Sequence, residues 1–329
     1  MEEKIEKELK WAVLGTGVIA NEMAQALEKM GKKLYAVANR THSKAVEFAK
    51  KYGVGKVYDK IEDMFTDEET DIIYITTPHN THIKFMIEAL KNGKHVLCEK
   101  SITLNSEELE EAVKIAKEKN LILGEAMTIF NMPLYTELSE IVNSGKLGDV
   151  KMIQVNFGSY KEYDMNNRFF NRNLAGGALL DIGVYAISIT RLFMTSKPDN
   201  VLSQVKYAPT GVDEQASIIM MNKEQQMSTI ALTLHSKQPK RVVIACEKAY
   251  IEITEYPRAD KAKIVYTETG EVEEITAGMT SNALQYELQN MEESVKTGIN
   301  KMKLEYTIDV MDIMTKLRKE WGMTYPEEE

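Results

Sequence analysis

The chain has 329 residues and a net charge of −9 at pH 7, and 43% of its residues are hydrophobic and 28% charged. This length is too great for one ordinary core and predicts two domains, and the composition is that of a globular protein. The acidic balance argues against a nucleic-acid partner, because binding a phosphate backbone requires a basic face. No run of about eighteen apolar residues occurs, so no membrane association is expected.

The N-terminus and the cysteines indicate a cytoplasmic protein. Residues 1–10 are charged and lack the apolar segment of a signal peptide. Cys98 and Cys246 each lie in an apolar, strand-like run. They are interpreted as buried free thiols in a reducing compartment and not as a disulfide framework.

The first predicted elements are a strand at residues 11–14, a glycine turn and a helix that begins at Val18. Gly15 allows the tight turn, Gly17 lets a pyrophosphate approach the backbone, and Ala20 permits close packing of helix on strand. The helix N-terminus offers N–H groups and a positive dipole end to phosphates. The alternative is an ordinary strand-to-helix turn. The residues expected to contact a dinucleotide here are Gly15, Thr16, Gly17, Val18 and Ile19.

The second strand, residues 34–38, ends in Asn39-Arg40. Many NAD-binding proteins carry an acidic residue at this position that binds the ribose 2′-hydroxyl, and none is present here. Arg40 can pair with a 2′-phosphate and stack on adenine, which favours NADP over NAD. The alternative is that Arg40 is a solvated loop residue.

Two further strands, residues 72–76 and 95–98, place polar residues at their carboxyl ends, where ligand groups gather in open α/β sheets. His82 begins a helix and is expected to cap it or to line the pocket. His79, His82 and His95 lie near one another in the sequence, but they lack the i, i+4 histidine pair with a carboxylate, so no metal site is predicted. The residues expected near a cofactor are Thr77, Pro78, His82, Glu99 and Lys100.

Alternating strands and helices over residues 10–125 predict a doubly wound parallel sheet, so the first domain is expected to be a Rossmann-type domain at residues 1–125. Residues 126–329 are expected to form an α+β domain for substrate binding and oligomerisation. Its helices are predicted at 134–143, from about 176 to 193, at 282–296 and at 305–321. Its strands are predicted at 150–157, 201–207, 216–221, 227–234, 241–246, 250–254 and 262–266.

These strands predict a large, mostly antiparallel sheet with one face on helices and the other exposed or paired. Alternating apolar positions within Ile218–Met220 and Ile230–Leu234 indicate a sheet face too apolar for solvent and predict a homodimer, or a larger homo-oligomer containing the same contact. The polar, aromatic loop at residues 158–173 is long enough to be functional. Its candidate substrate contacts are Tyr160, Tyr163, Arg168 and Asn171.

Asp181 and Tyr185 are four residues apart in the predicted helix that follows this loop, so they share one face. An ionisable pair on an otherwise apolar helix indicates either a functional pair or a satisfied polar group beside a core aromatic residue. Spacing alone leaves the two interpretations open.

Four motifs occur in an order that resembles the Gfo/Idh/MocA oxidoreductases. They are Gly15-x-Gly17-x-Ile19-Ala20, Thr77-Pro78-x-x-x-His82, residues 93–100 ending in Glu99-Lys100, and residues 176–185 containing Asp181-x-x-x-Tyr185. The last form is similar to the branch that holds dimeric dihydrodiol dehydrogenase, NADP-dependent xylose dehydrogenase and glucose–fructose oxidoreductase. Two departures are Ser101, where the family has proline, and Glu247-Lys248, where a glycine turn is usual; the serine is expected to leave its loop less rigid.

The resemblance implies that Lys100 and Tyr185 are catalytic, with Asp181 beside them. The expected reaction is hydride transfer between NADP(H) and the carbinol carbon of a sugar, polyol or vicinal diol. A free tyrosine titrates near pH 10, and a neighbouring lysine lowers that pKa, so Tyr185 is the expected proton donor and acceptor. The competing hypothesis is a dinucleotide-binding sensor of the same fold without turnover.

Overall fold

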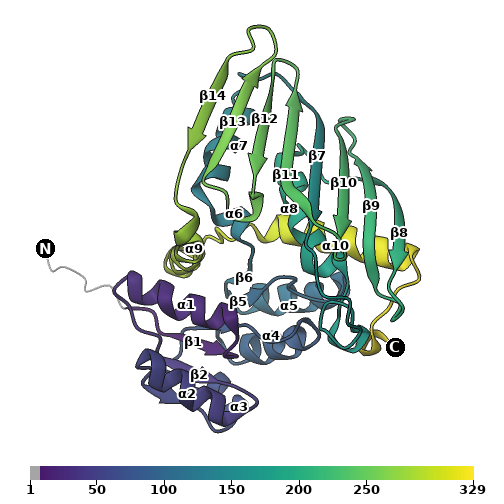
Figure 1. Cartoon of the computed structure of the whole chain (residues 1–329). Coiled ribbons are helices and arrows are strands. Elements are labelled where there is room, and N and C mark those ends of the chain that lie inside the picture. The colour runs from purple at the N-terminus through teal and green to yellow at the C-terminus, as the bar shows by residue number, and fades with distance from the viewer. Residues whose placement is uncertain (1–7) are drawn as a thin grey trace, which may run out of the picture.

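The structure is a computed structural model that describes residues 8–329. Residues 1–7, most of the charged N-terminal stretch, lie outside the described residues. Two β-sheets organise the chain, a parallel sheet in the N-terminal part and a larger sheet in the C-terminal part (Figure 1).

The first sheet confirms the predicted doubly wound architecture. Its six strands are parallel in the order β3-β2-β1-β4-β5-β6. The strand order reverses between β1 and β4, and ligands bind at such a point, beyond the carboxyl ends of the strands. The strands are β1 (Trp11–Leu14), β2 (Ala36–Ala38), β3 (Lys56–Val57), β4 (Ile72–Ile75), β5 (His95–Glu99) and β6 (Leu123–Ala126).

Five helices accompany this sheet. The Asn105 side chain accepts the Glu108 N–H at 2.9 Å and so caps the last of them, and Asn105 with Glu108 three residues later is the sequence pattern of a capping box. Three elements of this half, β3, α2 and α3, are not among the sequence predictions. β3 has two residues and α3 has six, so each is shorter than the stretch of sequence over which a hydrophobic period can be recognised. The helices are α1 (Val18–Lys29), α2 (His42–Tyr52), α3 (Ile61–Thr66), α4 (His82–Lys91) and α5 (Ser106–Glu118).

The second sheet has eight strands in the order β14-β13-β12-β11-β7-β10-β9-β8. All neighbours are antiparallel except β7 and β10, which agrees with the predicted mostly antiparallel sheet. The edge strand β14 was not predicted, because only Ile275 in it is buried. The strands are β7 (Val150–Gly158), β8 (Asn200–Tyr207), β9 (Asp213–Met221), β10 (Met227–Thr233), β11 (Gln238–Cys246), β12 (Ala249–Thr254), β13 (Lys261–Tyr266) and β14 (Val272–Thr276).

Helices cover one face of this sheet and connect it to the first one (Figure 1). They are α6 (Thr128–Asn131), α7 (Pro133–Asn143), α8 (Val184–Phe193), α9 (Ala283–Thr297) and α10 (Leu304–Glu320). α9 lies beside α1, and its Leu284, Leu288 and Met291 share an apolar core with Trp11 of β1. The late helices therefore fix the two sheets against each other.

Two sequence expectations concern single segments. Residues 172–193 are apolar enough to cross a membrane by composition, but 83% of their most apolar window is buried inside the protein, as in a core helix. Both cysteines are free, Cys98 buried in β5 and Cys246 partly exposed at the end of β11. The expectation of full burial was therefore wrong for Cys246, which is the last residue of its strand.

Candidate active site

The turn between β1 and α1 has the backbone that a dinucleotide requires. Gly15 has φ +112°, and a Cβ at this position would lie 2.4 Å from Thr76 Oγ1, so only glycine fits. A Cβ on Gly17 would meet no protein atom within 4 Å, because the space beside it is open. No side chain caps the N-terminus of α1, and Val18 is 79% exposed. The turn fits a pyrophosphate group, which the free N–H groups of α1 would hold.

Asn39 ties the end of β2 to this turn. Its side-chain Nδ2 donates to Thr16 Oγ1 at 2.8 Å, and its side-chain Oδ1 accepts the Thr41 N–H at 2.8 Å. Arg40 is exposed, and its guanidinium makes no ion pair with any residue between 8 and 329. It is available to an anionic ligand beside the turn.

The loop after β4 is held from inside by His82. The ring is fully buried, with Nε2 2.7 Å from the Thr77 carbonyl oxygen and Nδ1 3.0 Å from that of Ser101. Pro78 begins a 3-10 turn, and the Thr81 hydroxyl donates to Thr77 Oγ1 at 2.8 Å. His82 therefore joins the loops that follow β4 and β5 and has no exposed surface of its own.

The other two histidines serve the backbone as well. His79 Nε2 lies 3.0 Å from the Lys100 carbonyl oxygen, and burial and the nearby His82 lower the pKa of His79 to about 3. His95 Nδ1 accepts the Ile122 N–H at 2.9 Å. Across residues 8–329, no three histidine, cysteine or acidic side chains are grouped so as to hold a metal ion.

The structure brings together Lys100 at the end of β5 with Asp181 and Tyr185 from the C-terminal part. Lys100 Nζ donates to the Asp181 carbonyl oxygen at 2.8 Å and to its Oδ1 at 3.2 Å. The same ammonium lies 4.9 Å from the centre of the Tyr185 ring. Glu99, the preceding residue, is half-buried and accepts a hydrogen bond from the Tyr74 hydroxyl.

Burial and mutual attraction set the charges in this group. Burial acts to lower the pKa of Lys100, but Asp181 and Tyr185 outweigh it and hold that pKa above its usual value. Burial acts to raise the pKa of Asp181, yet Lys100 and Arg168 keep it below its usual range. Burial raises the pKa of Tyr185, and Lys100 opposes the rise. The site thus contains an ion pair next to a phenol that is protonated at neutral pH.

The segment that carries Asp181 and Tyr185 differs from the continuous α-helix that the spacing predicted. Leu179–Gly183 form a π-helical turn, and α8 begins only at Val184. A Cβ on Gly183 would lie 2.9 Å from the Leu232 side chain, so this glycine allows close approach to β10. Such wide turns are frequent at functional sites. Both Asp181 and Tyr185 nevertheless reach Lys100.

Ser101 fixes the β5 loop to this turn. Its fully buried hydroxyl donates to the Leu180 carbonyl oxygen at 2.9 Å, a bond that proline cannot make. The expectation of a less rigid loop is not met at this contact. The other departure, Glu247-Lys248, lies where β11 turns into β12, and Glu247 pairs with Lys151 at 2.9 Å.

Of the four candidate residues in the 158–173 loop, only Arg168 forms an ion pair with the group made up of Lys100, Asp181 and Tyr185. Its guanidinium is 3.8 Å from Asp181 Oδ1. Tyr160 stacks on His235, the Tyr163 hydroxyl donates to Glu214, and Asn171 accepts the Asn173 N–H. These three stabilise the loop and its surroundings.

Sequence reasoning missed four charged residues near this site. Arg258, which follows β12, pairs with Glu22 of α1 at 3.0 Å and so links the large sheet to the dinucleotide turn. Lys161 and Lys240 contribute positive charge around Asp181. Only Lys161 offered a signal, because it lies in the long polar loop.

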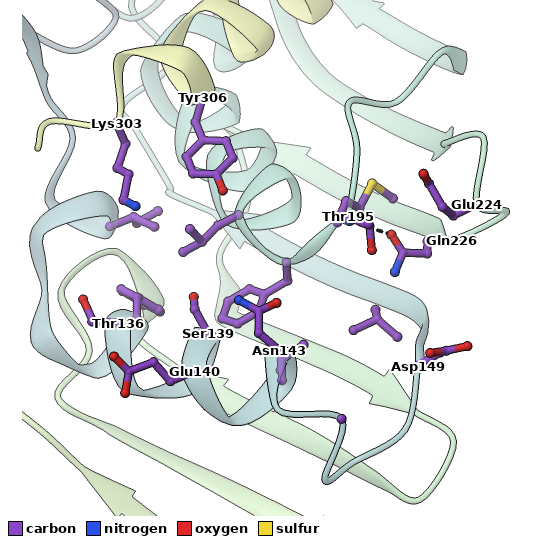
Figure 2. A pocket seen from close by; sticks show the side chains of 18 of the residues that line it. Thr136, Ser139, Glu140, Asn143, Asp149, Thr195, Glu224, Gln226, Lys303 and Tyr306 are labelled. Atoms are coloured by element: carbon purple, nitrogen blue, oxygen red, sulfur yellow. Dashed lines mark hydrogen bonds between the residues drawn. The ribbon is translucent and has the colours of Figure 1, made fainter. Parts of the chain in front are cut away.

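A well-formed cavity lies elsewhere. It has a volume of about 750 Å³ and lies between α7, the start of β7 and the start of α10. Figure 2 shows Ser139 and Asn143 on one side of it and Tyr306 on the other. Lys151, near the start of β7, lines this cavity, whereas the 158–173 loop begins at the other end of the strand, about 24 Å away at about 3.4 Å per residue. The cavity is therefore separate from the Lys100 site.

Comparisons with known proteins agree with this arrangement. Residues 9–127 match the model of an oxidoreductase family with an NAD-binding Rossmann fold, and residues 135–252 match the GFO/IDH/MocA C-terminal domain. Trans-1,2-dihydrobenzene-1,2-diol dehydrogenase of Xenopus laevis is 30% identical, with 96% of this chain and 99% of the relative covered. The protein of the same name from Homo sapiens is 26% identical, with 97% and 99% covered.

Solved structures share the fold. A 3-ketoreductase from Actinomadura kijaniata in complex with NADP and TDP-benzene has a TM-score of 0.85 at 18% identity, covering 95% of this chain and 98% of that one. A levoglucosan dehydrogenase in complex with NADH and levoglucosan has a TM-score of 0.83 at 16% identity, with the same coverage. With both domain models and a full-length relative matched, the chain belongs to the Gfo/Idh/MocA family of NAD(P)-dependent oxidoreductases.

Proposed function

We propose that this protein transfers a hydride between NADP(H) and the carbinol carbon of a sugar, polyol or vicinal diol. The observation that carries the proposal is the meeting of Lys100, Asp181 and Tyr185 beyond β5, on the sheet edge that also holds the glycine turn. The curated relatives are named as diol dehydrogenases, and the structural neighbours include a 3-ketoreductase and a levoglucosan dehydrogenase. NADP(H), when bound, supplies or accepts the hydride.

The residues of this chain supply binding and proton transfer. Gly15, Gly17 and the N-terminus of α1 hold the pyrophosphate, and Arg40 takes the 2′-phosphate. Tyr185 Oη gives a proton to the forming hydroxyl in reduction and takes one in oxidation. Lys100 stabilises the phenolate that results.

Asp181 holds Lys100 in place through its Oδ1 and its backbone carbonyl oxygen. It also keeps Lys100 charged. The remaining residues expected at the cofactor are Thr77 and Pro78 in the loop after β4 and Glu99 at the end of β5, and these would line the cofactor site. His82 does not line the site but supports the loop after β4 through its contact with the Thr77 carbonyl oxygen.

The alternative is a sensor that binds the dinucleotide without turnover. Such a protein has no need of a proton donor, and the buried ion pair beside Tyr185 therefore favours an enzyme. The test is a screen of the purified protein with NADP+ and aldoses, polyols and diols, followed at 340 nm. Turnover supports the enzyme, whereas NADP+ binding with no absorbance change for any compound supports the sensor.

We also propose a homodimer formed through the outer face of the large sheet. Leu202, Ile219 and Tyr250 are exposed on this face, by 62%, 43% and 38%. The alternating apolar positions within the predicted ranges, Ile218, Met220, Ile230, Leu232 and Leu234, are buried instead, so the sequence indicated the wrong residues for this face. Apolar side chains that alternate with buried ones on a wide sheet fit a second copy of the same face. Ile219→Lys is expected to shift the mass measured by light scattering from dimer to monomer, and Val46→Lys, an exposed change in α2, is the control. A monomeric wild-type protein at micromolar concentration would contradict this proposal.

A further inference from the structure

Positive charge is concentrated around the proposed substrate site of this acidic protein. Lys161 Nζ lies 4.2 Å and the Arg168 guanidinium carbon 4.1 Å from the centre of the same ring, that of Phe169. Lys240 of β11 lies 5.4 Å from the ring of Phe157. That ring is 6.0 Å from the ring of Tyr185, and the Arg168 guanidinium is 3.8 Å from Asp181 Oδ1, so Lys240 and Arg168 border the proposed proton-transfer residues.

The nearby carboxylates do not balance this charge. Asp181 is shared between Lys100 and Arg168. Lys240 pairs at 3.1 Å with Glu255, whose side chain is 70% exposed. Within residues 8–329, Lys161 forms no ion pair with a carboxylate, although it is partly buried.

The two acidic residues of the same loop do not supply the missing charge. Glu162 and Asp164 are both exposed. Asp164 accepts the backbone N–H of Asn166 at 2.9 Å and so closes a turn of its own loop. Glu99 also interacts with Lys100, so the four cations Lys100, Lys161, Arg168 and Lys240 stand against three carboxylates, and the group keeps one excess positive charge.

Like charges held close together are unfavourable unless an anion joins them. Burial lowers the pKa of Lys161, and Asp181 opposes this shift, while Arg168, Lys100 and Lys240 lower the pKa further. A phosphate or a carboxylate accepts charge-assisted hydrogen bonds from both an ammonium and a guanidinium.

We infer that Lys161 and Arg168, with Lys240 beside them, form an anion subsite that binds a phosphate or carboxylate group of the substrate. The inference rests on the proposed function and narrows it, because the substrate is then an anionic hydroxy compound, such as a sugar phosphate or a sugar acid, and not a neutral diol. The cations lie on the loop and on the large sheet, apart from the glycine turn that holds the cofactor phosphates.

The first experiment measures binding without turnover. The full-length protein, saturated with NADP+, is titrated with inorganic phosphate at constant ionic strength and followed by ³¹P NMR. Lys161→Met and Arg168→Met are each expected to raise the phosphate Kd about tenfold. The control is Lys151→Met, which removes a lysine at the other end of β7 and is expected to leave the phosphate Kd unchanged. Equal phosphate Kd values in wild type and Lys161→Met would overturn the subsite.

The second experiment separates the subsite from the cofactor and from the proposed function. Both variants are expected to keep the NADP+ Kd of the wild type, and a tenfold rise would assign these cations to the cofactor and overturn the inference. Neutral compounds are then compared as substrates with matched anionic ones. Glucose is compared with glucose 6-phosphate and with gluconate, and xylose is compared with xylonate. A higher kcat/KM for the anionic members, lost in Lys161→Met, supports the subsite, whereas preference for the neutral members overturns it. Phosphate binding that depends on Lys161 with no turnover of any compound would retain the subsite and refute the proposed function.

Discussion

The dinucleotide turn and the Lys100 site lie on the same edge of the first sheet but are built in different ways. The turn is made of backbone between the end of β1 and the start of α1, and its fit depends on the absence of side chains at Gly15 and Gly17. The Lys100 site is made of side chains from the end of β5, the π-helical turn and α8, and Lys100 and Asp181 are 81 positions apart in the sequence. The first site is local and open, and the second is assembled and buried.

This difference predicts that the two sites fail separately. A change in the turn should weaken cofactor binding and leave the proton transfer intact in whatever complex still forms. A change at Lys100 or Tyr185 should slow the reaction and leave cofactor affinity nearly constant. The predictions below test this separation, beginning with the largest expected effect.

Lys100→Met should lower turnover by about 10²–10⁴, the usual loss when a residue that sets up acid–base catalysis is removed. In reduction, the phenol of Tyr185 must be protonated, so the rate falls as pH rises through the pKa of Tyr185. Lys100 opposes the rise in that pKa, so its loss raises the pKa and moves the fall in rate to higher pH. A pH–rate profile of the reduction tests this, with Lys151→Met as the control. An unchanged profile would remove Lys100 from the mechanism.

Arg40→Ala should weaken NADP binding about 10–100-fold, since a charge-assisted contact to phosphate contributes roughly 1.5–3 kcal/mol. NAD binding should change little, because NAD lacks the 2′-phosphate. Fluorescence titration with each nucleotide gives the two dissociation constants. Lys50→Ala, an exposed change near the end of α2, is the control. Equal affinities of the wild type for NADP and NAD would show that Arg40 does not read the 2′-phosphate.

Gly17→Ala should weaken cofactor binding about tenfold and leave the thermal unfolding temperature unchanged. The new methyl group meets no protein atom within 4 Å, so the fold has room for it, but it enters the space of the pyrophosphate. Gly15→Ala is the informative contrast, because its methyl group meets Thr76 and its φ of +112° is strained for alanine. That variant should lose stability as well. The pair is measured by calorimetry and by nucleotide titration, and equal destabilisation of both would refute the open-space interpretation.

The same contrast explains what the sequence could and could not predict. The glycine turn, the alternation of strands and helices that gives the parallel first sheet, and the helix cap at Asn105 follow from local patterns of residue types. The proximity of Lys100 to Tyr185 could be stated only through the family resemblance, because no local pattern relates β5 to α8. The π-helical turn at Leu179–Gly183 was missed because a hydrophobic period does not show how tightly a helix is wound.

Charged residues without a local pattern were the least predictable. Arg258 and Glu22 are 236 positions apart and meet only because α9 holds the large sheet against α1. The short strand β3 and the edge strand β14 bury few side chains, so their sequences carry almost no periodic signal. Tertiary packing, and not propensity, determines each of these features.

Tyr185→Phe tests the central claim most directly, because it removes one hydroxyl group and leaves the ring in place. The measurement is steady-state turnover together with the NADP+ dissociation constant on the same preparation. Tyr256→Phe is the control, because the Tyr256 hydroxyl is buried without a hydrogen-bond partner among the described residues. Turnover should fall by about 10²–10⁴ while the NADP+ dissociation constant stays within twofold. Normal turnover of Tyr185→Phe would contradict the account and leave Asp181 and Tyr185 as a structural pair.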